Sequence, residues 1–548
     1  MHKKRKPQKG KEPPKIPGDS PKSPGFPETG PAKSSLPWLL AAGAALLVGT
    51  GARLWYYFLK DSLWRDESKL LLNIAHKSFA ALLGPLEYDQ EAPIPLLWLY
   101  RLLYLAGAGG ELPLRAVSLI PSILTLILFF FLAKRILADR RAVLFVTWLL
   151  ALAPGVILYA AMTKHYAWDI LVAAVLLWLA APVLISPDKP PSLTRLYWAA
   201  ALVPWISYPG IFVLGGIGVG LILRYRTLGL WPVAGFLAMT ALSVSFEIFV
   251  VLDRLLLPER AGIMNKFVAA FNIIQNVQDW WLWLFCQIFY AYLGPQKISM
   301  GCLEYPFGYY LDPFVLAVAG LGALGLWECK RLSGWAWTVA LIGPLLLALV
   351  AYFFRLYLPF GRLLLFATPG LYLLAGYGAV WLFRKVPWPR LVGVILVILV
   401  IPCGKYAWEA FERPVGGVRE GLQYIAAQQQ SGDLVFFDTF AAPTIAYYRL
   451  LGRPYAVSLT YGLHPEDWIE GKVDDPKLQA KDVLPFIPPG RRIWLVAEAV
   501  DYVRGPLTNT HPYWYDVAVA LDTHRASISS FITERVQVVG FYPRIETR

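Results

Sequence analysis

The sequence predicts a polytopic α-helical membrane protein with about eleven transmembrane helices, followed by a C-terminal extracytoplasmic α/β domain. Of the 548 residues, 57% are apolar and only 16% are charged, whereas soluble globular proteins contain about 25% charged residues. The apolar residues form runs long enough to cross a bilayer, and the loops between these runs alternate in size and charge. The composition therefore excludes a soluble enzyme, and it excludes disorder except locally.

The N-terminal segment 1–34 is rich in Lys and Pro and shows no apolar periodicity. It cannot bury enough surface to fold, so we expect a disordered basic cytoplasmic tail. The tail could instead lie against anionic lipid. It holds nine Lys/Arg against three Asp/Glu, a large part of the net charge of +14. The basic balance therefore reflects membrane topology and does not indicate a nucleic-acid partner.

Eleven apolar runs are predicted as membrane spans within a transmembrane domain at 35–407. They are 37–59, 112–133, 142–160, 165–186, 196–209, 210–223, 229–252, 311–327, 335–353, 361–383 and 391–407. The two runs that meet at Tyr208-Pro209-Gly210 are short.

The loops between the spans predict the orientation. If the tail is inside, the inside loops are 134–141, 187–195, 224–228, 328–334 and 384–390. They hold thirteen Lys/Arg and three Asp/Glu, as the positive-inside rule requires. The large segments 60–111, 253–310 and 408–548 then lie outside. We therefore expect a multi-pass protein of a plasma (inner) membrane whose function is on the extracytoplasmic side.

The C-terminal segment 408–548 alternates helix-like and strand-like runs, which predicts a small α/β domain. GVREGLQYIAAQQ is helix-like, whereas DLVFF (433–437), YAVSL, RIWLVAE and VQVVGFY are strand-like. The domain contains neither a Gly-rich phosphate loop nor a GxSxG elbow. We expect a lid or an acceptor-docking module.

Two acidic residues, Asp66 and Glu67, follow the first span by only a few residues. A carboxylate at this depth could act as a general base on an acceptor hydroxyl, or it could bind a divalent cation. Alternatively, the pair is the ordinary acidic start of the amphipathic helix that follows, favoured there by the helix dipole.

Further carboxylates lie at a similar depth. Asp169 is near the start of the fourth span, Glu247 is near the outer end of the seventh, and Asp253 follows just beyond. Charges in spans usually mark a polar cavity or a pairing partner. Because the middle of the membrane carries none, the pattern predicts an outward-facing cavity at the interface.

Cations gather at the same level. Lys164 and His165 begin the fourth span, Arg362 begins the tenth, and Arg355 ends the ninth. An anion shared between these side chains and the free N–H groups of a helix N-terminus would be stabilised. His165 and Asp169 are spaced i, i+4 and so share a helix face. Together these residues predict a phosphate site, although each could simply snorkel to lipid headgroups.

The aromatic stretch 280–292 (WWLWLFCQIFYAY) is predicted as an interfacial helix or belt anchor. Cys286 and Cys302 fall in the same outer region and could pair, but the four cysteines lack metal-site spacing.

Several segments together resemble a known superfamily. In chain order they are WRDE (64–67), QEAPIPL (90–96), ELPLRAVSLIPSILTLILFFFLAKRIL (111–137), LALAPGVILYAAMTKHYAWDIL (150–171) and GRLLLFATPGLYLLAGYG (361–378). Their order and topological side resemble the GT-C superfamily of integral-membrane glycosyltransferases. The resemblance is closest to the protein O-mannosyltransferase, lipid A aminoarabinose-transferase and rhizobial lipopolysaccharide-transferase branches. It covers about 55–408.

The resemblance implies transfer of a sugar from a polyprenyl-phosphate-linked donor to an extracytoplasmic lipid, glycan or protein, with inversion. It implies that Asp66 deprotonates or orients the acceptor and that Glu67 supports Asp66 or contacts the sugar. The implied phosphate-binding residues are Lys164, His165 and Arg362, which Arg355 could join. We also expect Tyr166, Gln90 and Asp169 to bind the substrate. If a divalent metal ion is bound, Asp66 and Glu67 would be its ligands. Many relatives carry a second acidic residue where this chain has Met162, and the Pro stretch lacks a His.

Three other functions remain open. A transporter would favour midplane polar groups and an internal repeat, and neither is evident. A non-catalytic scaffold would present the C-terminal domain for binding and would leave Asp66 dispensable. A ligase or polymerase of lipid-linked glycans would share the lipid phosphate but take an oligosaccharide.

Overall fold

The computed structural model describes the helical body and parts of the C-terminal segment. The described residues are 36–60, 62–88, 90–185, 192–251, 288, 313–354, 356–358, 361–412, 417–430, 433–437, 441–452, 492–498, 525–532 and 536–543. The predictions for the tail 1–34, Asp253, the Cys286–Cys302 pair, the aromatic stretch 280–292 apart from Ile288, and Arg355 lie outside them.

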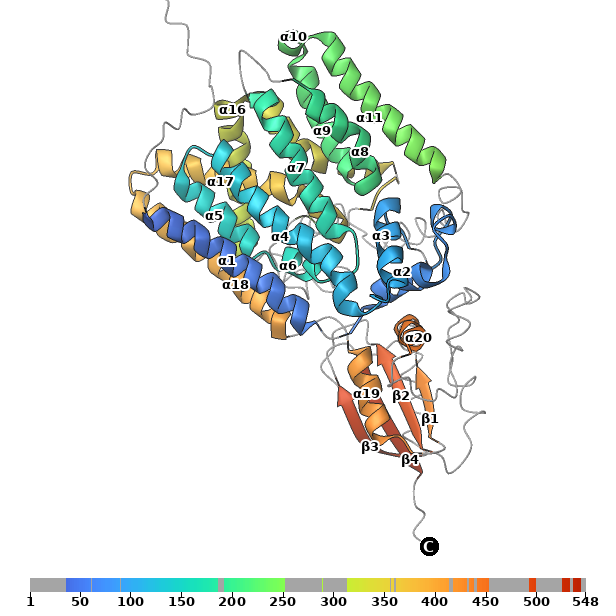
Figure 1. Ribbon diagram of the computed structural model, residues 1–548. Coiled ribbons are helices and arrows are strands. Elements are labelled where there is room, and N and C mark those ends of the chain that lie inside the picture. Colours follow the sequence, from blue (N-terminus) through green and yellow to red (C-terminus); the bar gives the residue numbers. More distant parts are fainter. Residues whose placement is uncertain are drawn as a thin grey trace, which may run out of the picture.

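Helices, most of them long and apolar, form the body of the molecule (Figure 1). They are α1 (Leu36–Leu59), α4 (Glu111–Ile136), α5 (Arg140–Ala151), α6 (Pro154–Ala160), α7 (Tyr166–Ile185), α8 (Thr194–Ile206), α9 (Gly210–Leu223), α10 (Tyr225–Leu228), α11 (Leu230–Val250), α16 (Pro313–Phe353), the 3₁₀ segment η3 (Gly361–Ala367), α17 (Thr368–Lys385) and α18 (Pro389–Glu412). Each predicted span overlaps one of these elements. The chain is therefore a mostly helical, multi-pass membrane protein.

The described helices do not establish the number of spans. Seven are long and apolar enough to cross a membrane, or eight if the bent pair α5–α6 is one span. The short helices α8 and α9 have 13 and 14 residues. The runs 311–327 and 335–353 form the two arms of α16, which meet at Gly334 with a φ of 81°, a value that favours glycine. The number of eleven membrane spans therefore remains a prediction.

Two predicted spans have irregular backbone. The run 142–160 bends by 50° between α5 and α6. Arg53, buried on α1, donates to the carbonyls of Leu150 and Ala151 at this break, each at 3.0 Å. The run 361–383 begins as η3, so Arg362 does not sit in the first turn of an α-helix as expected. Pro369 near the start of α17 lacks an N–H and disfavours α-helix immediately before it.

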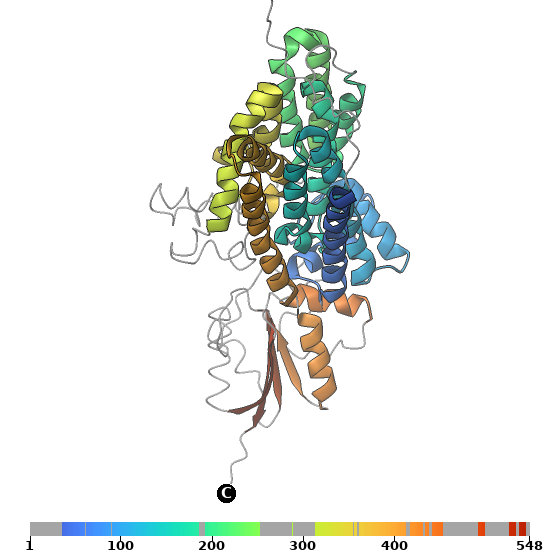
Figure 2. The same cartoon turned by 90° about the vertical axis from the view of Figure 1, so that its left-hand side faces the viewer.

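The short elements between α1 and α4 pack against the C-terminal elements below the helical body (Figure 2). These are α2 (Arg65–His76), η1 (Ala81–Leu83) and α3 (Ile94–Leu105). Helix α2 is amphipathic, as predicted, and buries Leu70, Leu71 and Ile74.

The described C-terminal residues form two helices and a four-stranded sheet with the order β1-β2-β4-β3. The elements are α19 (Val418–Gln428), β1 (Leu434–Phe437), α20 (Ala442–Leu450), β2 (Ile493–Glu498), β3 (Arg525–Ile532) and β4 (Val536–Pro543). Strands β1 and β2 are parallel, with Leu434 opposite Ile493, and the other neighbouring pairs are antiparallel. The predicted strand YAVSL lies outside the described residues.

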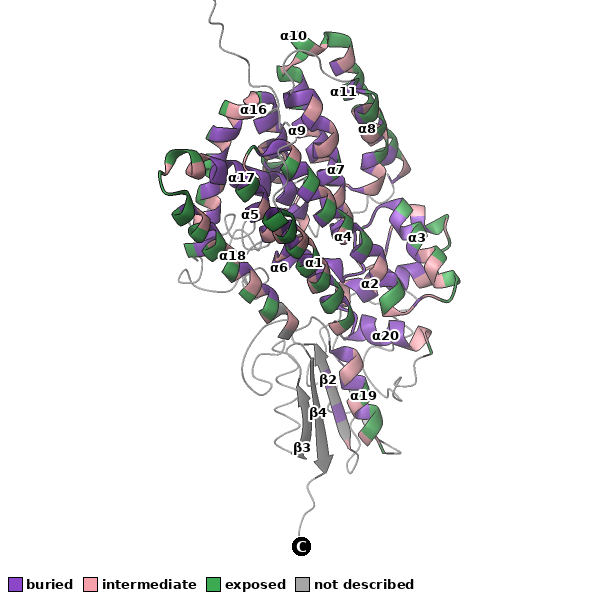
Figure 3. Cartoon of the chain, turned by 60° about the vertical axis from the view of Figure 1, so that its left-hand side comes forward, coloured by how far each residue is buried: buried purple, intermediate pink, exposed green. Residues whose placement is uncertain are grey.

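Buried side chains form two clusters, and Figure 3 shows how burial is distributed over the elements. One fills the helical body. The other joins α2, α3 and the start of α4 to α19, β1, α20 and β2. The C-terminal elements therefore share an apolar core with the helix that carries the acidic motif.

Candidate active site

The site is built around the start of α2. The Glu67 carboxylate accepts a hydrogen bond from the backbone N–H of Trp64 at 2.9 Å, which satisfies a donor that the first turn of a helix leaves free. This bond turns Glu67 back toward the chain entering the helix. Asp66 is rotated by about 100° around the helix axis, so it faces different neighbours.

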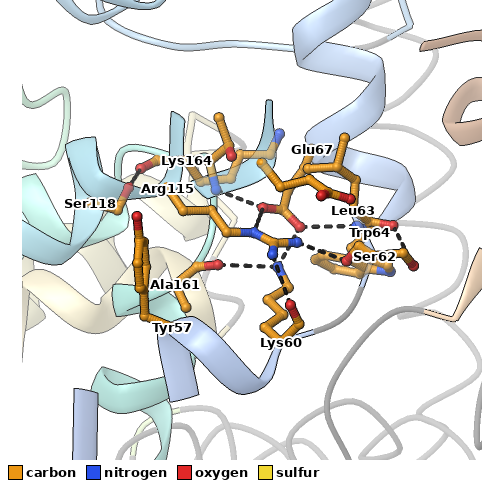
Figure 4. Close-up of polar contacts among 12 residues, drawn as sticks. Tyr57, Lys60, Ser62, Leu63, Trp64, Glu67, Arg115, Ser118, Ala161 and Lys164 are labelled. Carbon is orange, nitrogen blue, oxygen red and sulfur yellow. Dashed lines mark hydrogen bonds and ion pairs between the residues drawn. The ribbon is translucent and has the colours of Figure 1, made fainter. Parts of the chain in front are cut away.

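Glu67 is completely buried, and its oxygens are fully engaged (Figure 4). It forms an ion pair with Lys60, and Arg115 Nε lies 3.7 Å from its Oε1 atom. The backbone N–H of Thr163 donates to the same oxygen at 2.7 Å. Burial alone would raise the pKa of Glu67, but Lys60 and Arg115 lower it to about 2. Glu67 thus links α1, α2, α4 and the α6–α7 turn from within the protein.

Asp66 remains in contact with solvent, because 15% of its side chain is exposed. Its Oδ2 atom accepts a hydrogen bond from Arg362 Nη1 at 2.8 Å. The Arg362 guanidinium also lies over the Trp64 ring, 5.4 Å from its centroid. Burial would raise the pKa of Asp66, but Arg362 and Lys164 together lower it to about 2. Asp66 is therefore ionised at neutral pH.

Lys164 supplies the second cation. It lies in the turn between α6 and α7, where its backbone carbonyl accepts a hydrogen bond from Ser118 at 2.8 Å. Its buried ammonium donates to the side-chain oxygen of Gln90. Burial lowers the pKa of Lys164 to about 8, since the neighbouring carboxylates Asp66 and Glu67 only partly offset the loss of water. Among the described residues no carboxylate forms a salt bridge with this buried ammonium, so it is suited to receive an anion.

The predicted residues His165, Tyr166 and Asp169 lie together at the start of α7. His165 Nε2 is 3.7 Å from Asp169 Oδ2, and Ser207 donates to the other Asp169 oxygen at 2.6 Å. The ring of Tyr166 packs edge-on against Tyr159, with centroids 5.0 Å apart. Within the described part of the chain, His165 Nδ1 is buried and has no hydrogen-bond partner.

Sequence reasoning anticipated part of this arrangement. Asp66, Arg362, Lys164 and Gln90 are brought together in pairs, whereas Glu247 is buried on α11 and belongs to another part of the body. The sequence analysis did not assign Lys60 and Thr163 to holding Glu67. Lys60 directly follows the first apolar span, and a cation there within reach of an acidic pair was the available signal.

The carboxylates do not fit a shared divalent metal ion. No group of three or more His, Cys, Asp or Glu side chains converges in the described ranges. Moreover, Asp66 is bound by Arg362 and Glu67 by Lys60, so each carboxylate is already neutralised by a cation. Ligands for a divalent ion need free oxygens directed at one point.

Comparison with known proteins gives structural likeness only. No protein-family model matches the chain, and no curated protein matches it. Among solved structures, ArnT from Cupriavidus metallidurans bound to undecaprenyl phosphate is 16% identical with a TM-score of 0.47, and its apo state is 15% identical with a TM-score of 0.49. Each match covers 92% of this chain and 97% of the other.

An oligosaccharyltransferase from Archaeoglobus fulgidus is 12% identical, with a TM-score of 0.43 over 90% of this chain and 73% of that one. The arabinofuranosyltransferase AftD from mycobacteria is 14% identical, with a TM-score of 0.43 over 93% of this chain and 42% of that one. These structures belong to the GT-C superfamily, which the sequence motifs resemble.

Proposed function

We propose that the chain is a membrane glycosyltransferase that moves a sugar from a polyprenyl-phosphate-linked donor to an extracytoplasmic acceptor, with inversion at the anomeric carbon. The observation that carries the proposal is the pair of cations, Lys164 and Arg362, beside the partly exposed carboxylate of Asp66. An anion-binding pair next to an ionised carboxylate offers both halves of such a reaction, which are a site for the leaving phosphate and a group to receive a proton.

The donor phosphate competes with Asp66 for Arg362. A phosphate offers several oxygens to a guanidinium, and bidentate Arg–phosphate pairs are among the stronger hydrogen-bonded pairs. When the phosphate binds between Arg362 and Lys164, Asp66 loses its cation partner. Its pKa then rises from about 2, and the carboxylate becomes a better base where the acceptor arrives.

The chemical step follows from this geometry. An oxygen of the acceptor hydroxyl forms the new bond to the anomeric carbon while its proton passes to Asp66. The bond between that carbon and the phosphate oxygen breaks, and the electron pair leaves with the lipid phosphate, where Lys164 and Arg362 stabilise the charge. Attack opposite the leaving phosphate inverts the anomeric centre. An acceptor that is already an anion needs Asp66 only for orientation.

The other residues support this centre. Glu67 is assigned to holding the α2 entry, because its oxygens are engaged by Lys60, Arg115 and two backbone N–H groups. Gln90 positions the Lys164 ammonium. Asp169 orients the His165 imidazole, whose free Nδ1 atom is available to the donor. We propose that Asp66 and Glu67 hold no metal ion during transfer.

Ligand-dependent thermal unfolding tests the lipid-phosphate site. The detergent-purified protein is melted with and without a polyprenyl phosphate, as wild type, Lys164→Ala, Arg362→Ala and the control Arg226→Ala, which alters an exposed cation on α10. At one hundred times its dissociation constant the ligand should stabilise wild type and control by about 2.7 kcal/mol, and both site variants should lose this shift. No stabilisation across several polyprenol lengths, with folded protein, would contradict the proposal.

A further inference from the structure

A separate apolar groove is lined by residues of α1, α5, α17 and α18, none of which belongs to the candidate active site. Its volume is about 880 Å³, and nearly all of its lining is apolar. Leu144, Trp148 and Leu152 recur at i, i+4 and i+8 along one face of α5, and Val397 and Ile401 of α18 form a wall. Gly393 on α18 widens the groove, because a Cβ built there would meet no atom within 4 Å.

One end of the groove is basic. Arg141 at the start of α5 and Arg390 at the start of α18 both line it. Arg141 is held in place by Asp139, at 2.6 Å, and by the Phe383 ring, whose centroid is 3.7 Å from the guanidinium carbon. Arg390 is exposed, and across the described ranges no hydrogen bond or ion pair engages its side chain. An anionic group at this end would therefore meet one fixed and one available guanidinium.

The groove is long enough for a lipid of one leaflet of a bilayer. From Arg390 to Gly404, both of which line it, an α-helix rises by about 21 Å. Half of a typical hydrocarbon core is about 15 Å, so the groove accommodates acyl chains and a glycerol backbone from a single leaflet. A second copy of this chain fits poorly, because the neighbouring loops 134–141 and 384–390 are basic and would face like charges.

We propose that this groove binds an anionic glycerophospholipid, with its acyl chains along the α5 and α18 walls and its phosphate headgroup at Arg141 and Arg390. The apolar lining accounts for the chains, and the charge at one end selects the headgroup. Because Ala41 of α1 also lines the groove, the lipid contacts both α1 and α18. The site is independent of the sugar-transfer chemistry.

The experiment uses the full-length protein in mild detergent, with phosphatidylglycerol and phosphatidylcholine as probes. Binding is counted by native mass spectrometry, and thermal unfolding is followed in parallel. Gly393→Phe fills the groove with a side chain that meets open space, and Arg390→Gln removes the available cation. The matched controls are Gly51→Phe, at an exposed position on α1 with equally open space, and Arg226→Gln on α10.

Phosphatidylglycerol should bind wild type and both controls in preference to phosphatidylcholine and raise their unfolding temperature. Gly393→Phe should abolish this effect, and Arg390→Gln should weaken binding roughly fivefold, as expected for one basic residue at a membrane surface. Equal binding of both lipids, or unchanged binding in Gly393→Phe, would overturn the proposal. So would a protein dimer that Gly393→Phe dissociates, because the groove would then belong to a second copy.

Discussion

Asp66 and Glu67 are adjacent in the chain, yet their carboxylates have different surroundings. The Glu67 carboxylate is buried and is contacted by Lys60, Arg115 and two backbone N–H groups. Asp66 reaches solvent and pairs with Arg362. Adjacent positions on a helix differ by about 100° in direction, so one acidic pair can supply a structural anchor and a reactive group.

Replacing Asp66 should therefore affect chemistry more than stability. Asp66→Asn keeps the size of the side chain but removes the base, so we expect sugar transfer to fall by roughly 100-fold or more. The unfolding midpoint should fall less than in Glu67→Gln, because the Asp66–Arg362 pair reaches solvent whereas the Glu67–Lys60 pair is fully buried. Transfer to a hydroxyl acceptor, measured with a labelled lipid-linked sugar, checks this. Activity close to that of wild type would exclude Asp66 as the base.

Replacing Glu67 should show the opposite balance. Glu67→Gln leaves the buried Lys60 ammonium without its carboxylate, and breaking a buried ion pair in this way costs about 3–5 kcal/mol. Denaturant or thermal unfolding in detergent measures the loss. Lys405→Gln is a control, because the Lys405–Glu409 pair is exposed. A Glu67→Gln protein as stable as this control, but inactive, would instead indicate direct contact with substrate.

The lowered pKa of Lys164 predicts how lipid-phosphate binding depends on pH. Its pKa is lowered to about 8, so the ammonium is charged below this pH and loses its proton above it. Affinity for a polyprenyl phosphate should thus be constant up to about pH 8 and then fall, by at most tenfold per pH unit. The unliganded protein should gain stability over the same interval, because a buried cation with a lowered pKa opposes folding while it is charged.

Thermal shift titrations between pH 7 and pH 10 measure both trends, since a phosphate monoester is already doubly ionised there. Lys164→Gln removes the group and should bind more weakly with no such decline. A decline that persists in this variant would assign the titration to another group.

At the scale of elements, α20 braces α2. Thr444 and Ser68 are hydrogen-bonded at 2.9 Å, and the backbone N–H of Leu63 donates to the Tyr448 hydroxyl at 3.0 Å. The same hydroxyl bonds Glu111 at the start of α4, which also pairs with Arg419 of α19 at 2.9 Å. The C-terminal elements are thus fixed to the segment that positions Asp66, an arrangement that suits a support better than a freely moving lid.

Tyr448→Phe tests this support. It leaves the buried Leu63 N–H without its acceptor, which costs about 1–3 kcal/mol, and it should lower the transfer rate by loosening the approach to α2. Tyr447→Phe is the control, because it also removes a buried hydroxyl of α20, one that donates to Gly109 O at 2.8 Å. Equal transfer rates in the two variants at matched stability would argue against a positioning role for Tyr448.

At the scale of the whole molecule, the C-terminal elements and α10 lie at opposite ends of the helical body. The sheet and α19 extend from the end of the body that holds α2, while α10 lies at the far end (Figure 1). Short basic loops, including 134–141 and 384–390, connect the helices. The positive-inside rule predicts that these loops face the cytoplasm, so we expect the candidate active site on the extracytoplasmic side.

Cysteine labelling tests this orientation in cells. In a background with Cys286 and Cys302 replaced by serine, Ser78→Cys in the first large loop should react with a membrane-impermeant maleimide. Ser192→Cys in the predicted inside loop 187–195 should react only after permeabilisation. Both serines are exposed, and the remaining native cysteines, Cys329 and Cys403, are buried. Labelling of Ser192→Cys in intact cells would reverse the topology.

Local patterns in the sequence determined the membrane character, the approximate helix positions, the amphipathic α2 and the strand runs of β1, β2 and β4. These properties depend on neighbouring residues, through apolar run length and through helical or alternating periodicity. The sequence could also mark Asp66, Lys164 and Arg362 as charges at one depth. It could not pair them, because Asp66 and Arg362 are 296 positions apart.

Only the tertiary structure decided which charge meets which. In the structure, Asp66 pairs with Arg362, Glu67 pairs with Lys60, and the Lys164 ammonium donates a hydrogen bond to Gln90. It also placed Arg362 in a 3₁₀ segment and bent α5–α6 at the carbonyls that Arg53 binds. Such pairings depend on how distant segments pack, and a buried charge is stable only where packing brings it a partner. The roles of two adjacent carboxylates were therefore fixed by helix packing rather than by their order in the chain.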